Sequence, residues 1–319
     1  MNEFELIKSY FKSLSKNNPG AKKLNDDVFF DKKNNLVVSV DTYNEGIHFP
    51  NFKYPELIVK KIIRSSISDL ICKSVKPEYF FISASGNKKS FSKKNLKLIS
   101  KIIKKEQTKY NLKLSGGDTT NSNKVSFSIT TVGFSKKIIE RNNAMLNDDI
   151  YVTGNIGDSY LGLKIIKNNF KMSPDLKKYF IYQFYSPDLP FKIYKELKKF
   201  ANTTIDVSDG LISDMSKLIN KQKLSFEINL NKIPISNNLK MYLKKYNKKK
   251  KDYLFNGDDY QILFTASSKK RTLIKSIAKK MNQKITIIGK IHKAYKKNLL
   301  KLDNKSQNLT NFKGYSHKF

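Results

Sequence analysis

Apolar residues in the first half of the chain recur at two spacings, one typical of helices and one typical of strands. Recurrence every three to four residues predicts helical segments at 4–14, 57–74 and 92–110. Short apolar runs or strict alternation predict strands at 36–40, 79–82, 113–115 and 125–134. The first strand ends at Asp41, and the third leads into a Gly-Gly-Asp loop. The resulting order of elements is βαβαβ-like.

The pattern breaks around residues 141–147, and we expect a domain boundary there. The chain then divides into a first domain over 1–146 and a second over 147–319. The second half contains predicted helices that begin near 158 and cover 175–185, 191–200 and 209–219, and predicted strands at 149–153, 203–205, 225–230, 260–264 and 284–288. Both halves are therefore predicted to be α+β with mixed sheets.

The composition is that of a folded protein of two domains. Of the 319 residues 39% are hydrophobic, which is enough apolar material for real cores. The single cysteine, Cys72, excludes a disulfide framework, and its place in a helical pattern predicts a buried small hydrophobe. No apolar run reaches the length of a membrane span, and the first residues lack the apolar core of a signal peptide. We expect a soluble, cytoplasmic protein with no membrane partner.

The charge of the chain is strongly positive. Lys and Arg number 62 against 27 Asp and Glu, a formal net charge of +35. Such a charge suggests a basic nucleic-acid-binding protein as an alternative. Lysine is spread along the whole chain, however, and there is no recognition-helix signature, zinc-finger spacing or RNP-type aromatic motif. We therefore expect solvated lysine-rich faces and no nucleic-acid partner.

The acidic residues are scarce, yet they recur in clusters beside Gly, Ser or Thr. The six clusters are at 25–27, 39–42, 68–69, 116–120, 206–210 and 257–259. Loop carboxylates flanked by small residues suit hard cations and phosphates. The same residue types also form turns and caps, which explains any one cluster as well. Six clusters, several of them directly after strand-like runs, favour a ligand site.

The remaining motifs restrict the chemistry. The three histidines, His48, His292 and His317, have no metal-ligand spacing, and there is no GxSxG elbow, GxxxxGK[ST] phosphate loop or GxGxxG fingerprint. Several carboxylates around a polyphosphate require divalent cations between them and the ligand. Phosphoryl transfer relies on positioning and charge neutralisation more than on a covalent group. The residues alone thus favour Mg-ATP chemistry.

Read in order, the clusters resemble the thiamine-monophosphate kinase family, within the aminoimidazole-ribotide-synthetase-like ATP-binding superfamily. The resemblance runs from about Leu6 to Phe319. It is carried by the stretches NDDVFF, SVDTYNEGIHF, SSISDL, SGGDTT, DDIYVTGNIGDSYLGL, TIDVSDGLISD, NGDDYQILFT, ITIIGKI and FKGYSHKF. Each stretch is weak by itself, whereas the ordered set at the family's spacing is specific.

The resemblance implies that ATP phosphorylates thiamine phosphate to thiamine diphosphate by direct in-line transfer, assisted by several Mg²⁺ ions and without a covalent catalytic residue. The implied metal ligands are Asp27, Ser39, Val40, Asp41, Asp69, Asp118, Asp206 and Asp209. The implied ATP contacts are Gly117, Asp118, Arg141 and Ser208, and the implied substrate contacts are His48, Asp258 and Phe312. Asp26 is interpreted as a cap or turn residue beside Asp27.

Four features depart from the family pattern. The Gly that is common before the first Asp pair is absent, with Leu24-Asn25 in its place. Val40 replaces a usual Thr, so a ligand there survives only if it is the backbone carbonyl. Asp258 stands where Glu is usual, one methylene shorter, and Phe312 stands where Trp is usual, which keeps the stacking face and loses the indole N–H.

The resemblance also implies a homodimer, an N-terminal ATP- and metal-binding domain that pairs with its mate, and a C-terminal α/β domain. Within the superfamily the alternative is an enzyme like aminoimidazole ribotide synthetase, although the EGIHF and FKGYSHKF stretches fit the thiamine enzymes better.

Overall fold

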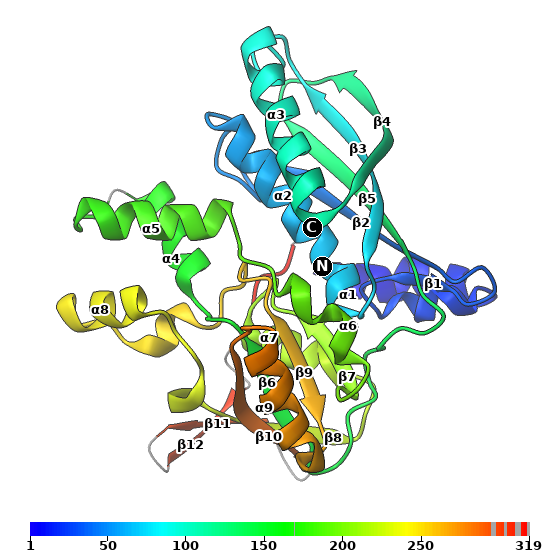
Figure 1. Ribbon diagram of the computed structural model, residues 1–319, viewed down its shortest axis with the longest axis vertical. Coiled ribbons are helices and arrows are strands. Elements are labelled where there is room, and N and C mark those ends of the chain that lie inside the picture. Colours follow the sequence, from blue (N-terminus) through cyan, green and yellow to red (C-terminus); the bar gives the residue numbers. More distant parts are fainter. Residues whose placement is uncertain (169, 295–297, 303–304, 310–313, 318–319) are drawn as a thin grey trace.

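The computed structural model describes residues 1–168, 170–294, 298–302, 305–309 and 314–317 (Figure 1). The α-helices of this part are α1 Glu3–Leu6, α2 Pro55–Cys72, α3 Lys93–Tyr110, α4 Asp158–Lys167, α5 Pro174–Tyr185, α6 Tyr194–Leu197, α7 Leu211–Leu218, α8 Asn237–Lys245 and α9 Arg271–Lys280. The strands are β1 Phe29–Asp31, β2 Leu36–Asn44, β3 Pro77–Gly86, β4 Lys113–Asn121, β5 Ser126–Phe134, β6 Asp149–Thr153, β7 Thr203–Asp206, β8 Leu224–Asn229, β9 Ile262–Ala266, β10 Ile285–Lys293, β11 Leu299–Leu302 and β12 Lys305–Asn308. The fold is α+β with two mixed sheets, as the sequence predicts.

The first sheet has the strand order β1-β2-β5-β3-β4, in which only β3 and β4 run parallel. Helix α2 packs on the middle strands and α3 packs on α2, so both helices lie on one side of the sheet (Figure 1). On that side Val37 and Ile129 are buried, in the alternation expected of a sheet with one covered face. On the other side Val40 is 64% and Phe81 38% exposed. One face of the first sheet is thus uncovered in the single chain.

The segment predicted as a Gly-Gly-Asp loop is instead part of β4. The strand continues through Gly116 and Gly117 to Asn121, and every residue in it is exposed. The loop prediction was wrong because glycine is typical of turns, whereas here Gly117 lets two strands approach closely. A Cβ on Gly117 would lie 1.7 Å from the carbonyl oxygen of Ile82.

The second sheet has the order β12-β11-β8-β10-β6-β9-β7, with β11 and β8 the parallel pair. Strand β6 is buried along its whole length, because it lies between β10 and β9 inside the sheet. Strands of the first sheet all precede residue 146, and those of the second all follow it.

One hydrophobic cluster joins the two halves. Residues of α2, including Ile58 and Ile62, belong to the same cluster as Phe184 and Phe264 from the second half. The buried guanidinium of Arg64 on α2 bonds the Glu106 carboxylate on α3 and the carbonyl of Pro187 beyond α5. Helix α2 therefore connects the two sheets.

Most of the elements predicted from periodicity are present, and the residual differences are local. Ser92, the predicted start of the second long helix, is the N-cap of α3, and Cys72 is buried as predicted. The helical segment at the N-terminus changes from α1 to a π turn at Ile7–Phe11 and a 3-10 turn at Lys12–Ser15, and its apolar residues are not buried. Among the α-helices and strands of the described residues, the patterns missed β1, α8, α9, β11 and β12. Among the described residues, no helix combines the length and the apolar character needed to cross a lipid bilayer.

Candidate active site

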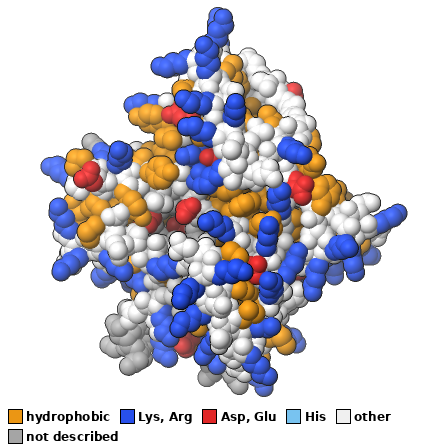
Figure 2. All heavy atoms as spheres, viewed as in Figure 1, with side chains coloured by type: hydrophobic (Ala, Val, Ile, Leu, Met, Phe, Trp, Pro, Cys, Tyr) orange, Lys and Arg blue, Asp and Glu red, His pale blue; other side chains and the backbone are white. Residues whose placement is uncertain are grey.

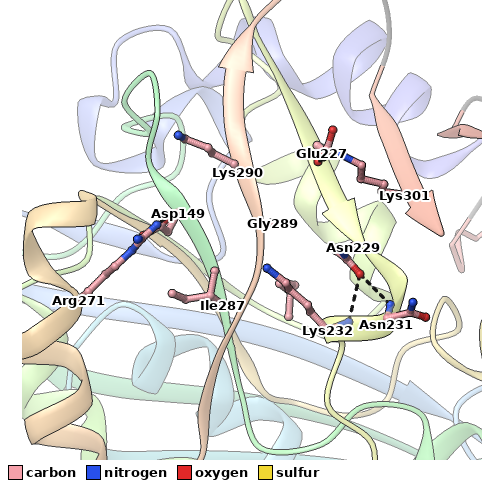
Figure 3. Close-up of a pocket in the computed structure, with 11 residues that line it drawn as sticks. Asp149, Glu227, Asn229, Asn231, Lys232, Arg271, Ile287, Gly289, Lys290 and Lys301 are labelled. Carbon is pink, nitrogen blue, oxygen red and sulfur yellow. Dashed lines mark hydrogen bonds and ion pairs between the residues drawn. The ribbon is translucent and has the colours of Figure 1, made fainter. Parts of the chain in front are cut away.

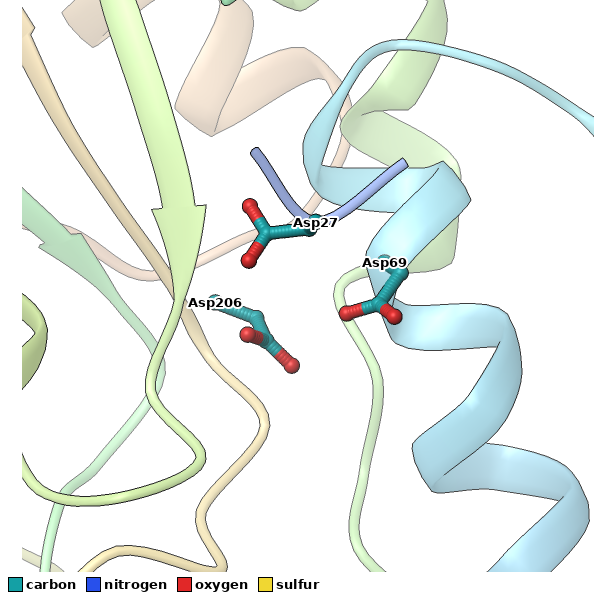
Figure 4. A group of neighbouring side chains, drawn as sticks. All are labelled: Asp27, Asp69 and Asp206. Atoms are coloured by element: carbon teal, nitrogen blue, oxygen red, sulfur yellow. The ribbon is translucent and has the colours of Figure 1, made fainter. Parts of the chain in front are cut away.

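Three carboxylates from distant parts of the sequence converge between the two halves. Asp27 lies just before β1, Asp69 is in the last turn of α2, and Asp206 ends β7. One oxygen from each lies within 4.8 Å of the others, and Figure 4 shows the three side chains pointing toward one another. We refer to these three residues as the acidic cluster. It unites three of the eight predicted metal ligands.

Burial and mutual repulsion between carboxylates dominate the electrostatics of the acidic cluster. Burial raises the pKa of Asp206 to about 7 and that of nearby Asp41 to about 6. Burial also raises the pKa of Asp69 well above its usual range, and the charges of Asp41 and Asp206 add to this. The hydroxyl of Ser39 donates a hydrogen bond to Asp69. A bound cation stabilises the ionised form of such crowded carboxylates, and hard oxygen donors suit Mg²⁺.

Two cationic side chains already contact this region. The Lys73 ammonium lies 2.7 Å from Asp26 Oδ1 and 2.7 Å from Asp27 Oδ2. The Arg141 guanidinium bonds both carboxylate oxygens of Asp27. Asp26 does accept a hydrogen bond from the Asp27 amide, as a turn residue would, but it also accepts from the Arg141 amide and pairs with Lys73. The interpretation of Asp26 as a turn residue was therefore incomplete, and Lys73 was missed altogether.

The loop after β7 is shaped by Asp214, a buried residue of α7 that the sequence analysis did not single out. Its Oδ2 accepts hydrogen bonds from the backbone amides of Ser208, Asp209 and Gly210. Its Oδ1 accepts from Lys217, which also pairs with the Asp209 carboxylate. Ser208 and Asp209 are thus held next to Asp206. The sequence offered one signal for Asp214, which is its position near the start of an apolar helix, just after Asp209-Gly210.

A second loop, before β9, packs against the first. The Asp258 amide donates to the Ser208 carbonyl at 2.9 Å, and Gly257 lies so close to that carbonyl that a Cβ would be 2.0 Å from it. The Asp258 carboxylate pairs with Lys61 at 2.7 Å and accepts from the Tyr260 hydroxyl. Lys61 is 2% exposed, and its ammonium lies over the Phe184 ring. Lys61 was not predicted, since a lysine at helical spacing looks solvated.

His48 lies at the end of the site that also contains Asp258 and Lys61. Its Nδ1 accepts from the Asn44 amide, and its ring centroid is 5.2 Å from that of His317. Burial lowers the pKa of His48 to about 4, with His317 adding to the shift. The described C-terminal residues lie against the loop after β7, because the Tyr315 amide donates to the Asp209 carbonyl. Phe312 lies outside the described residues.

The other predicted residues lie apart from the acidic cluster in a single chain. Cross-strand pairing aligns Thr42, Ser128, Ser83 and Asp118 in one row of the first sheet. Asp118 therefore lies on the same uncovered face as Val40, and three strand spacings, about 14 Å, separate it from β2. The chain does not bring Gly117, Asp118 or the Val40 side chain to the acidic cluster.

A separate pocket of about 620 Å³ lies on the second sheet (Figure 3). Its walls hold two ion pairs, Arg271 with Asp149 and Lys301 with Glu227. The lining residues are Asp149, Glu227, Asn229, Asn231, Lys232, Arg271, Ile287, Ile288, Gly289, Lys290 and Lys301. None of them is among the predicted site residues.

Comparison with known proteins relates this geometry to a family. Residues 25–135 match the family described as AIR synthase related protein, N-terminal domain. The chain is 34% identical to the thiamine-monophosphate kinase of Buchnera aphidicola subsp. Acyrthosiphon pisum over 99% of this chain and 98% of that protein. It is 31% identical to the thiamine-monophosphate kinase of Aquifex aeolicus over 83% of this chain and 86% of that protein.

A solved structure described as AaThiL complexed with AMPPCP and TMP superimposes with a TM-score of 0.86 at 28% identity, covering 99% of this chain and 97% of that one. The similarity to both relatives and to the solved structure extends across both halves of the chain, and the acidic cluster draws ligand groups from both. The chain belongs to the thiamine-monophosphate kinase family.

Proposed function

We propose that the protein transfers the γ-phosphoryl group of ATP to thiamine phosphate, which gives ADP and thiamine diphosphate. The observation that carries the proposal is the convergence of Asp27, Asp69 and Asp206 in a chain similar over its full length to thiamine-monophosphate kinases. The similar structure with AMPPCP, an analogue of ATP, and TMP supports both substrates. The transfer uses no covalent protein intermediate, so positioning and charge neutralisation account for the rate.

The proposed metal ligands are Asp27, Ser39, the Val40 carbonyl, Asp41, Asp69, Asp118, Asp206 and Asp209. The crowded, buried carboxylates of the acidic cluster fit Mg²⁺, which when bound neutralises phosphate charge. The protein supplies the alignment, since Asp214 fixes the loop with Ser208 and Asp209. Arg141, held by Asp27, and Ser208 are the proposed ATP contacts nearest the cluster.

The thiamine end of the site is proposed at His48, Asp258 and Phe312. Thiamine phosphate carries a cationic thiazolium, which an Asp258 carboxylate attracts. Because burial lowers the pKa of His48 to about 4, that imidazole is neutral at pH 7 and does not repel the cation. An aromatic ring at 312 offers stacking or cation–π contact of roughly 0.5–2 kcal/mol.

We further propose that the enzyme is a homodimer whose partner completes the nucleotide site. The uncovered face of the first sheet exposes Val40 and Phe81, and Asp118 on the same face is about 14 Å from β2. Packing two such faces together buries these apolar residues and allows Gly117 and Asp118 of one protomer to lie next to β2 of the other, the strand that carries Ser39, Val40 and Asp41.

Mixing two inactive variants tests the shared site. Asp118→Asn and Asp69→Asn should each be inactive alone, and refolding them together should restore about a quarter of wild-type activity, since half the dimers then hold one intact site. Absence of recovery in mixed dimers would place both residues in the same chain's site.

The reaction is tested with purified enzyme, ATP, Mg²⁺ and thiamine phosphate, with free thiamine and aminoimidazole ribotide precursors as alternative acceptors. Only thiamine phosphate should be phosphorylated, and excess chelator should stop turnover. Asp69→Asn should lower kcat by orders of magnitude, whereas Asp175→Asn, at an exposed site on α5, should leave it unchanged. Phosphorylation of free thiamine would refute the assignment.

The basic nucleic-acid-binding alternative has no local support. Lys and Arg side chains are scattered over both halves of the visible face in Figure 2 and do not form one stripe. Tight, steeply salt-dependent DNA binding without ATP turnover would favour that alternative.

A further inference from the structure

Lys73 is a cation built into the acidic side of the active site. It directly follows α2, four residues after Asp69, and its side chain is completely buried. Its ammonium lies 2.7 Å from Asp26 Oδ1, 2.7 Å from Asp27 Oδ2 and 2.9 Å from the Thr204 carbonyl oxygen. The three acceptors match the three donors of an ammonium group, so it is fully satisfied in place.

A buried lysine is stable only when it is paired, and here the pairing uses a carboxylate of the acidic cluster. Asp27 is one of the three residues whose oxygens converge within 4.8 Å. The other cation on Asp27, Arg141, retains some exposure and is proposed to contact ATP. Arg141 bonds the Asp27 carboxylate alone with its guanidinium, whereas Lys73 bonds the carboxylates of both Asp26 and Asp27. Because Lys73 is part of the chain, its positive charge stays at the site when bound ions leave.

We propose that the Lys73 ammonium takes the place of one divalent cation on the Asp26 and Asp27 side of the acidic cluster. The site then binds fewer divalent ions than its carboxylates would otherwise hold, and it keeps its shape before metal or nucleotide arrives. The inference rests on the proposed metal site but not on the identity of the phosphoryl acceptor.

The test counts bound Mn²⁺ in the nucleotide-free protein by titration with electron paramagnetic resonance of the free ion. Wild type is compared with Lys73→Met and with Lys73→Gln, which removes the charge and keeps a hydrogen-bond donor. Lys250→Met is the matched control, since the Lys250 ammonium bonds the carbonyls of Leu230 and Ile233 rather than carboxylates. Thermal melting is recorded for all four proteins in chelator and in Mn²⁺.

Both Lys73 variants should bind one more Mn²⁺ per chain than wild type. Their melting temperature should fall by about 5–10 °C in chelator and recover in Mn²⁺, because an ion then replaces the ammonium. Lys250→Met should keep the wild-type ion count, and Mn²⁺ should restore none of its own loss of stability.

Two results separate the failure of this inference from the failure of the proposed function. If wild type binds Mn²⁺ and the Lys73 variants bind the same number, the Lys73 inference is wrong and the metal site stands. If neither wild type nor the variants bind Mn²⁺, the Lys73 inference fails together with the metal site proposed for the nucleotide-free protein, whereas turnover of ATP and thiamine phosphate decides the proposed function. Lys73 variants that stay unfolded even in Mn²⁺ would also overturn the inference, since a divalent ion should compensate for the missing charge.

Discussion

Single buried charges determine the local geometry of this site. Asp214 is fully buried, and one of its oxygens accepts hydrogen bonds from three successive backbone amides. Without this oxygen the three amides would lack their common acceptor. Lys61 has a similar role for Asp258, because the ion pair and the Phe184 ring fix where that carboxylate lies. Neither residue is in the proposed ligand set, yet each positions a residue that is.

The buried carboxylates predict how the stability of the metal-free protein depends on pH. Burial raises the pKa of Asp206 to about 7 and that of Asp41 to about 6, from ordinary values near 4. The folded state therefore binds protons more tightly than the unfolded state between about pH 4 and pH 7. The free energy of unfolding should fall as the pH rises through this window, by about 1–4 kcal/mol. Urea unfolding in chelator at pH 5 and pH 8 measures the difference.

Asp206→Asn supplies the control for this pH dependence. The variant lacks the titrating group, so its unfolding free energy should change less between the two pH values than that of wild type. The explanation fails if wild type is more stable at pH 8 than at pH 5 in chelator, or if the variant has the same pH dependence.

At the scale of elements, two consecutive glycines give the edge strand β4 a backbone conformation that other residues rarely adopt. Gly116 and Gly117 have positive φ angles of 149° and 153°, which side-chain-bearing residues rarely adopt. Their surroundings differ: a Cβ on Gly116 would meet only the Phe81 side chain at 3.1 Å, whereas one on Gly117 would overlap the Ile82 backbone.

This difference gives a matched pair of substitutions. Gly117→Ala should lower the free energy of unfolding by about 2–4 kcal/mol, because the backbone of β3 cannot yield without loss of strand pairing, and it should raise KM for ATP. Gly116→Ala should lower the free energy of unfolding by less than Gly117→Ala does, since the Phe81 ring is exposed and can move. Urea unfolding of both variants checks the order, and equal losses would contradict the role given to the Ile82 contact.

At the scale of the whole molecule, α2 packs against strands of both sheets. Its apolar residues belong to a cluster that continues into the second half, and Arg64 bonds groups from both halves. The candidate active site draws residues from both halves, so a small shift between the halves would separate Asp27 and Asp69 from Asp206.

Calorimetry should accordingly record one unfolding transition rather than a separate transition for each half. Arg64→Met should lower the free energy of unfolding by about 3–5 kcal/mol, because the Glu106 carboxylate is left buried without its partner. Lys105→Met, at an exposed position on α3, should have little effect. Two separate transitions in wild type would show that the halves unfold independently.

The amino-acid sequence was enough to predict the elements whose signal is local, and it showed the order of the acidic clusters. The periodicity of α3 and β5 is intrinsic to the chain, because each has one apolar face that must be covered whatever it packs against. The acidic residues at 27, 69 and 206 stood out by their scarcity in a chain of charge +35. Their ordered motifs were enough to indicate the family.

Which charged side chains come into contact depends on the packing of distant segments. Lys73 is only one of many lysines in the sequence, and its burial against Asp26, Asp27 and Thr204 follows from how β7 docks beside the end of α2. Asp118 looked equivalent to Asp69 as a motif, yet strand pairing puts it on the uncovered face of the sheet. Such contacts join residues far apart in the chain, so their geometry depends on packing that no local pattern contains.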